Sequence, residues 1–133
     1  MGKIIDKEFV QYILDEMNEC VKQGNFVVVK TEKNKTFASD FNITDKLRRR
    51  MLLDVKVEDY FNSDESRNFP GRYVHEFCPK YNLCNIDGND ELVDVYVKIE
   101  VEEEHTGKQI VVISFHRPEK EVRFAFSSQS KGE

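Results

Sequence analysis

Three side chains that could carry acid–base chemistry lie in the C-terminal half of the chain. Tyr96 and Lys98 stand in one alternating run of residues, and His116 ends a second one. A histidine titrates near neutral pH, so His116 could take up or release a proton during a reaction. Lys98 would stay cationic and could neutralise an anionic group, while Tyr96 could orient a ligand through its hydroxyl or ring. Together the three side chains could supply an acid or base, a cation and an orienting group to one site.

Two strands are needed to bring these side chains together. The first is predicted by the alternation between Leu92 and Val101, in which β-branched residues occupy every second position. Its buried face would carry Val93, Val95, Val97, Ile99 and Val101. The second strand is expected to place Val111, Ile113 and Phe115 on one face and Ile110, Val112, Ser114 and His116 on the other.

A turn centred near Thr106 would fix the register of this long hairpin. Lys98 would then lie opposite Ser114, and Tyr96 opposite His116, all on the less apolar face. Directly opposed residues in an antiparallel pair can touch. The sequence therefore predicts a cluster of Tyr96, Lys98 and His116 on one face of the hairpin.

Helices are predicted in the N-terminal half. Asp6 is a candidate N-cap, and apolar residues then recur at helical spacing until Gly24, which suits the position after a helix end. Residues 26–30 indicate a short strand, and their continuous apolar character predicts burial on both faces. The next apolar residues, Phe37, Ala38 and Phe41, fit one or two short helical turns.

Thr44 can cap a second definite helix, which carries a cluster of basic residues. This cluster is expected to be a solvated face, with contact to RNA or a protein partner as the second interpretation. It consists of Lys46, Arg48, Arg49 and Arg50.

The remaining segments favour strands and turns. Residues 55–61 fit an edge strand or an irregular turn, residues 72–78 a strand and residues 121–126 an edge strand, whereas residues 127–133 are expected to fray. Turn signals stand at 70–71 and 87–89. We therefore expect one α+β domain over residues 1–133. Helices and a short strand in 1–61 would pack on a twisted, mainly antiparallel sheet formed by 72–126.

Composition narrows the function classes. The net charge of −5 argues against loose, charge-driven binding to nucleic acid, and we expect no direct binding to DNA. No apolar run is long enough to span a membrane, and no signal-peptide core is present, so a cytoplasmic location is expected. The three cysteines are too few and too sparse for a disulfide framework and fit reduced thiols.

Four stretches of the chain resemble the MqsR-type toxins. Residues 95–101 (VYVKIEV) and 111–116 (VVISFH) resemble the C-terminal hairpin of that family, and residues 57–63 (VEDYFNS) resemble the segment before its catalytic sheet. The opening helix, which ends in Gln23-Gly24, is similar too. These proteins are mRNA interferases of type II toxin–antitoxin systems. The resemblance implies a RelE-like fold, cleavage of single-stranded mRNA without a cofactor, and a cognate antitoxin protein as partner.

Residue by residue, the resemblance gives a mixed result. Tyr96 matches the active-site tyrosine of the family, and Lys98 matches the lysine of the same string. His116 stands where the best-known members have a functional lysine, and a second lysine of the family appears here as Asn62. A glutamine of the family falls near His75 or its neighbour Glu76.

Metal-independent RNA cleavage needs a base for the 2′-hydroxyl, a cation for the phosphate and an acid for the leaving 5′-oxygen. His116 would be the base or the acid, and His75 is the candidate second acid–base partner. Lys98 would neutralise the phosphate. Further phosphate-binding candidates are Arg72, Arg117 and Arg123.

Two other interpretations remain open. A non-catalytic binding or regulatory module with the same fold is suggested by Asn62 in place of a lysine and by the acidic net charge. The spacing of His75, Cys78 and Cys84 invites a zinc site, but no second tight pair of ligands accompanies it. Core cysteines with a surface histidine are the better account, so we expect no metal.

Overall fold

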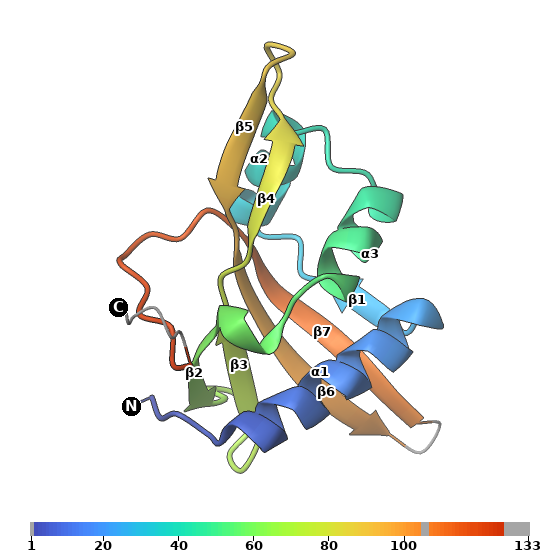
Figure 1. Cartoon of the computed structure of the whole chain (residues 1–133). Helices are drawn as coiled ribbons and strands as arrows, with labels where there is room; N and C mark the ends of the chain where they lie inside the picture. The colour runs from blue at the N-terminus through green and yellow to red at the C-terminus, as the bar shows by residue number, and fades with distance from the viewer. Residues whose placement is uncertain (1, 105–106, 127–133) are drawn as a thin grey trace.

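The computed structural model describes residues 2–104 and 107–126. A five-stranded sheet forms its centre, with the strand order β1-β7-β6-β3-β2. Figure 1 shows α1 lying across β6 and β7, and contacts between these elements confirm the packing. The strands are β1 (Phe26–Val28), β2 (Tyr60–Glu65), β3 (Tyr73–Phe77), β6 (Tyr96–Glu104) and β7 (Gly107–His116). The α+β class expected from the sequence is confirmed.

Three α-helices precede most of the sheet: α1 (Lys7–Lys22), α2 (Glu32–Asp40) and α3 (Asp45–Leu53). A short 3-10 turn, η1 (Val57–Asp59), leads into β2. Each helix begins as its sequence dictates, because a side-chain oxygen accepts a backbone N–H of the first turn. The capping residues are Asp6, Thr31 and Thr44. Helix α1 buries its apolar stripe on the sheet, as predicted, and also packs against α3.

The sheet is mixed, although mainly antiparallel as expected. β7 pairs antiparallel with β6, which pairs antiparallel with β3, and β3 pairs antiparallel with β2. β1 alone runs parallel to its neighbour, β7. β1 and β2 are therefore the two edges of the sheet. The prediction that residues 26–30 are buried on both faces is wrong, because Val27 of this edge strand is 47% exposed and Val29, directly after it, is 39% exposed.

The long alternating run that begins at Leu92 is not one strand. It breaks at Val95, where the backbone N–H donates to the Pro79 carbonyl. Residues before the break form β5 (Asp90–Asp94), which pairs with β4 (Lys80–Cys84) in a separate hairpin. Figure 1 shows this hairpin projecting from the main sheet. The sequence did not predict this break, because apolar residues alternate with the same period of two in β5 and in β6.

A β-bulge in β7 corrects the predicted faces of that strand. The register passes from Ile99 opposite Val112 to Lys98 opposite Ser114, so Ile113 is the extra residue. Ile110 and Val112, expected on the less apolar face, are fully buried in the core beside Phe115. After the bulge the alternation resumes in the opposite phase.

Asn34 in α2 holds the bulged part of β7. Its side-chain amide donates to the carbonyls of Val29, at 2.8 Å, and Ile113, at 3.0 Å. Its Oδ1 accepts the backbone N–H of Phe115 at 2.8 Å. Because β1 stops alongside Val112, this buried asparagine supplies the hydrogen bonds that a longer strand would otherwise make to β7.

The C-terminal segment departs from prediction as well. Residues 121–126 form no strand, although Ala125 donates its N–H to the Tyr60 carbonyl and Phe126 stacks on the Tyr60 ring. The predicted turn at Thr106 and the predicted frayed tail of residues 127–133 lie outside the described residues. Within the described ranges, no helix has the length and apolar character needed to cross a membrane.

Candidate active site

Tyr96 and His116 lie directly opposite each other on β6 and β7, as the sequence predicts. Their ring centroids are 5.5 Å apart in an edge-to-face arrangement. Phe61, at the register shift in β2, lies on the other side of Tyr96 with 6.0 Å between centroids. The tyrosine ring thus has two aromatic neighbours, one from the adjacent strand β7 and one from β2, which lies beyond β3.

A polar row crosses the sheet next to this pair. Asn62 is paired with Glu76, Glu76 with Lys98, and Lys98 with Ser114. Because directly paired residues point to the same side of a sheet, these four side chains share the face of Tyr96 and His116. The predicted pairing of Lys98 with Ser114 is confirmed.

Glu76 acts on Tyr96. Burial raises the pKa of the Tyr96 phenol, and the nearby Glu76 carboxylate, which is hydrogen-bonded to it, raises the pKa further. Tyr96 therefore stays protonated at neutral pH and donates its O–H to this acceptor. Glu76 is only 7% exposed, so the two side chains fix each other's position.

His116 is oriented by the backbone. Its Nδ1 lies 2.8 Å from the carbonyl oxygen of Arg117. Because a carbonyl oxygen only accepts hydrogen bonds, we assign the proton to Nδ1, which leaves Nε2 to exchange a proton with a ligand. This arrangement suits a histidine that acts in acid–base chemistry.

Two hollows open beside this face. One, of about 280 Å³, is lined by Phe61 and Tyr96 together with residues 118–120 and Val122. The other, of about 330 Å³, is lined by His116 and by α2 residues. Pro118 and Glu119 border both. Lys33 of α2 forms an ion pair with Glu119 at 2.7 Å and lowers the pKa of that carboxyl. The segment after β7 therefore runs between the hollows and is tied to α2.

His75 is not brought to this cluster. Its strand does lie beside the hairpin, but the residue is paired with core-facing Ile99, so its side chain is on the opposite face of the sheet. It is 6% exposed, and its Nδ1 lies 2.8 Å from Ser63 Oγ, which in turn lies 2.7 Å from the Tyr60 hydroxyl. Burial lowers the pKa of His75 to about 4. This geometry makes it a neutral part of a buried hydrogen-bond network.

The three arginines are placed differently from one another. Arg72 forms ion pairs with Glu100 and Glu102. Arg117 pairs with Glu91 at 2.9 Å and lies over the ring of Phe41. Arg123 is exposed on the segment after β7. Of the three, Arg72 and Arg117 already have carboxylate partners, so a phosphate would have to compete for them.

Sequence reasoning did not assign roles to two residues that shape this site. Glu76 was one of two alternatives for the family's glutamine, and only the strand pairing shows that it faces Tyr96 while His75 does not. Asn34 lies far away in the sequence, and a lone asparagine in a helix carries no signal that would link it to β7. Its role emerges from tertiary hydrogen bonds alone.

Comparisons with known proteins do not extend this picture. No protein-family model matches the chain, and no curated protein matches it either. Among residues 2–104 and 107–126, no group of three or more histidine, cysteine, aspartate or glutamate side chains could hold a metal ion. The geometry of the site therefore carries the functional argument.

Proposed function

We propose that this protein is an endoribonuclease that cleaves single-stranded mRNA without a metal ion. The observation that carries the proposal is the opposed pair of Tyr96 and His116, flanked on the same face by Lys98 and Glu76. Such a face offers an acid–base pair, a cation and an aromatic platform within one pleated surface. Single-stranded RNA is commonly bound by stacking on aromatic side chains.

The arrangement suggests separate roles on either side of β6. Neighbouring strands lie about 4.8 Å apart and each residue rises about 3.4 Å along a strand, so Glu76 on β3 and His116 on β7, offset by two positions, have roughly 12 Å between their backbones. We assign the Glu76 carboxylate to accept the proton of the attacking 2′-hydroxyl and His116 to protonate the leaving 5′-oxygen. Lys98, between them, neutralises the phosphate, and Tyr96 orients the nucleotide. The products would be a 2′,3′-cyclic phosphate and a 5′-hydroxyl end.

The biological setting that we propose is a type II toxin–antitoxin system. The resemblance of the hairpin to MqsR-type toxins supports it, as does the agreement of the predicted register with the structure at Tyr96 and Lys98. In that setting the protein acts on mRNA in the cytoplasm and is held inactive by a cognate antitoxin protein.

A second candidate function is a non-catalytic binding module with the same fold. Two carboxylates favour it, because Glu76 and Glu119 border the cluster and weaken its attraction for RNA phosphates. Asn62, in the polar row, also supplies no charge where the toxins have a lysine. The two functions differ in whether this face of the sheet cleaves RNA catalytically.

The decisive experiment incubates purified protein with a single-stranded RNA and maps the ends that form. We expect cleavage with cyclic-phosphate ends, reduced about 100-fold or more by His116→Ala and by Glu76→Gln. His75→Gln is the matched control, because it alters the other described histidine on the far face of the sheet. It should keep cleavage near the wild-type rate at pH 7. Intact RNA with folded wild-type protein would support the binding module instead.

Growth under tightly inducible expression tests the biological setting. We expect arrest with the wild type and relief by His116→Ala or Tyr96→Phe. Normal growth during wild-type expression, with the protein accumulating in folded form, would contradict the toxin assignment.

A further inference from the structure

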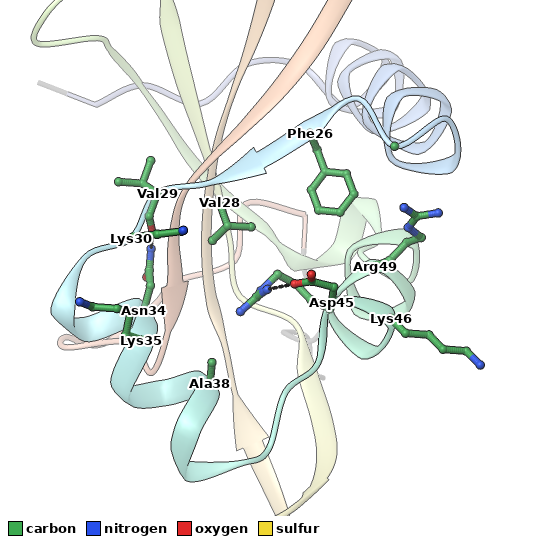
Figure 2. A pocket seen from close by; sticks show the side chains of 12 residues that line it. Phe26, Val28, Val29, Lys30, Asn34, Lys35, Ala38, Asp45, Lys46 and Arg49 are labelled. Atoms are coloured by element: carbon green, nitrogen blue, oxygen red, sulfur yellow. Dashed lines mark hydrogen bonds and ion pairs between the residues drawn. The ribbon is translucent and has the colours of Figure 1, made fainter.

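A basic pocket of about 870 Å³ lies along the edge strand β1, between it and helices α2 and α3. Figure 2 shows the side chains of Phe26 and Val28 pointing from β1 toward this space, with Ala38 facing it from α2. These apolar groups form the floor. The charged residues that line the pocket are Lys30, Lys35, Asp45, Lys46, Arg48 and Arg49.

The charges of the pocket do not cancel. Asp45, the one carboxylate among the described lining residues, is already paired with Arg48 at 3.1 Å. Arg49 lies over the ring of Phe26, with 5.8 Å to the centroid. Lys46 extends outward from α3 in Figure 2. A local excess of positive charge thus stands on a chain whose net charge is −5.

The backbone of β1 is unpaired on the side away from β7. The carbonyl of Asn25 accepts from Ile110, and the N–H of Val29 donates to Val112. In a parallel pair of strands, every second residue of one strand makes its backbone hydrogen bonds to the adjacent strand. Val27, midway between Asn25 and Val29, therefore also directs its N–H and C=O groups toward β7. The N–H and C=O groups of Phe26 and Val28 therefore face outward, and within the described chain no strand pairs with them.

We propose that the β1 edge and the basic pocket beside it dock an acidic, extended segment of another protein, which adds to the sheet as a strand. An incoming strand would satisfy both the donors and the acceptors of Phe26 and Val28, whereas RNA phosphates could only accept. Its acidic side chains would meet Lys46 and Arg49, and its apolar ones would cover exposed Val27. This inference does not depend on the ribonuclease activity.

The test uses the full chain labelled with ¹⁵N and a seven-residue peptide of alternating glutamate and valine. We expect the amides of Phe26 and Val28 to shift on titration and to exchange with solvent at least tenfold more slowly in the complex. The double variant Lys46→Glu/Arg49→Glu should weaken binding at least tenfold. Arg67→Glu, on the exposed loop after β2, is the control with the same type of charge change and should leave binding unchanged.

Two further probes distinguish an acidic protein segment from a basic one and from RNA as the partner of this edge. A peptide of alternating lysine and valine should bind at least tenfold more weakly, and a short oligouridylate should not slow exchange at Phe26 or Val28. The proposal is overturned if the acidic peptide leaves these amides unaffected or if the oligouridylate protects them instead. It is also overturned if protection grows with protein concentration alone, because the edge would then pair with a second copy of the chain.

Discussion

Glu76 and Lys98 lie directly opposite each other on β3 and β6, one step along the sheet from Tyr96 and His116. The two side chains carry opposite charges, so they add no net charge to the face with which to attract RNA. Recognition would instead depend on stacking and on specific hydrogen bonds. A phosphate bound at Lys98 would place the RNA next to the Glu76 carboxylate, the group assigned to accept a proton.

The pH dependence of RNA cleavage should report His116. If this histidine is the general acid, the rate at alkaline pH falls as the imidazole loses its proton, whereas a lysine would stay protonated to much higher pH. We expect His116→Lys to move the alkaline decline upward by at least one pH unit. Single-turnover rates between pH 5.5 and 9 would show this, and superimposable wild-type and variant profiles would exclude the assigned role.

The stability of the protein should fall in mild acid because of His75. Its pKa is about 4 in the folded protein, against about 6.5 for the ordinary side chain, so between these values the unfolded chain binds a proton that the folded chain does not. The contribution is complete above pH 6.5 and decreases as the pH falls toward 4, by about 3 kcal/mol in all. Urea unfolding from pH 7 to pH 4.5 should therefore show a weaker pH dependence in His75→Gln than in the wild type. If the free energy of unfolding depended equally on pH in the two proteins, His75 would not be neutral and buried in the folded state.

Asn34→Ala should destabilise the protein by about 3 kcal/mol, because it leaves buried backbone groups of β7 without partners. It should also lower RNA cleavage, since the strand that it holds ends in His116. Urea unfolding measures the first effect and initial rates the second. Asn82→Ala, on exposed β4, is the matched control and is expected to stay within about 0.5 kcal/mol of the wild type. A neutral Asn34→Ala would contradict the role given to this side chain.

Arg72→Ala should lower the folding free energy, because it removes the cationic partner of Glu100, which is 5% exposed. Adding Glu100→Gln should restore part of this loss, since the amide carries no charge. Thermal unfolding of the wild type, both single variants and the double variant gives the coupling between the two residues. Strictly additive losses would mean that the ion pair contributes no stability.

The sequence predicted those helices and strands that are determined by residues close together in the chain. The caps at Asp6 and Thr44 and the alternation of β6 are encoded within a few residues of where they act. Counting back from a turn at Thr106 predicted Tyr96 opposite His116, and that pairing is confirmed. The same count is one residue off between the bulge and the turn, where Ile99 pairs with Val112 instead of Ile113.

What sequence reasoning could not supply depends on partners distant along the chain. The exposure of β1 follows from its place at the edge of the sheet, and an apolar run gives no sign of that place. The choice between His75 and Glu76 required knowing which residue of β3 pairs with Lys98. The break at Val95 depends on a hydrogen bond to Pro79, which no periodicity reveals.

The extra residue at Ile113 has a consequence for any comparison of this chain with others. Before the bulge the even-numbered residues of β7 face the core, and after it the odd-numbered ones do. A related hairpin without the bulge would therefore align with both halves of β7 only if a one-residue gap were placed inside the strand. Gaps are normally placed in loops, not inside paired strands. A gap-free alignment of this strand with an unbulged relative would put either Ile110 or His116 on the wrong side of the sheet.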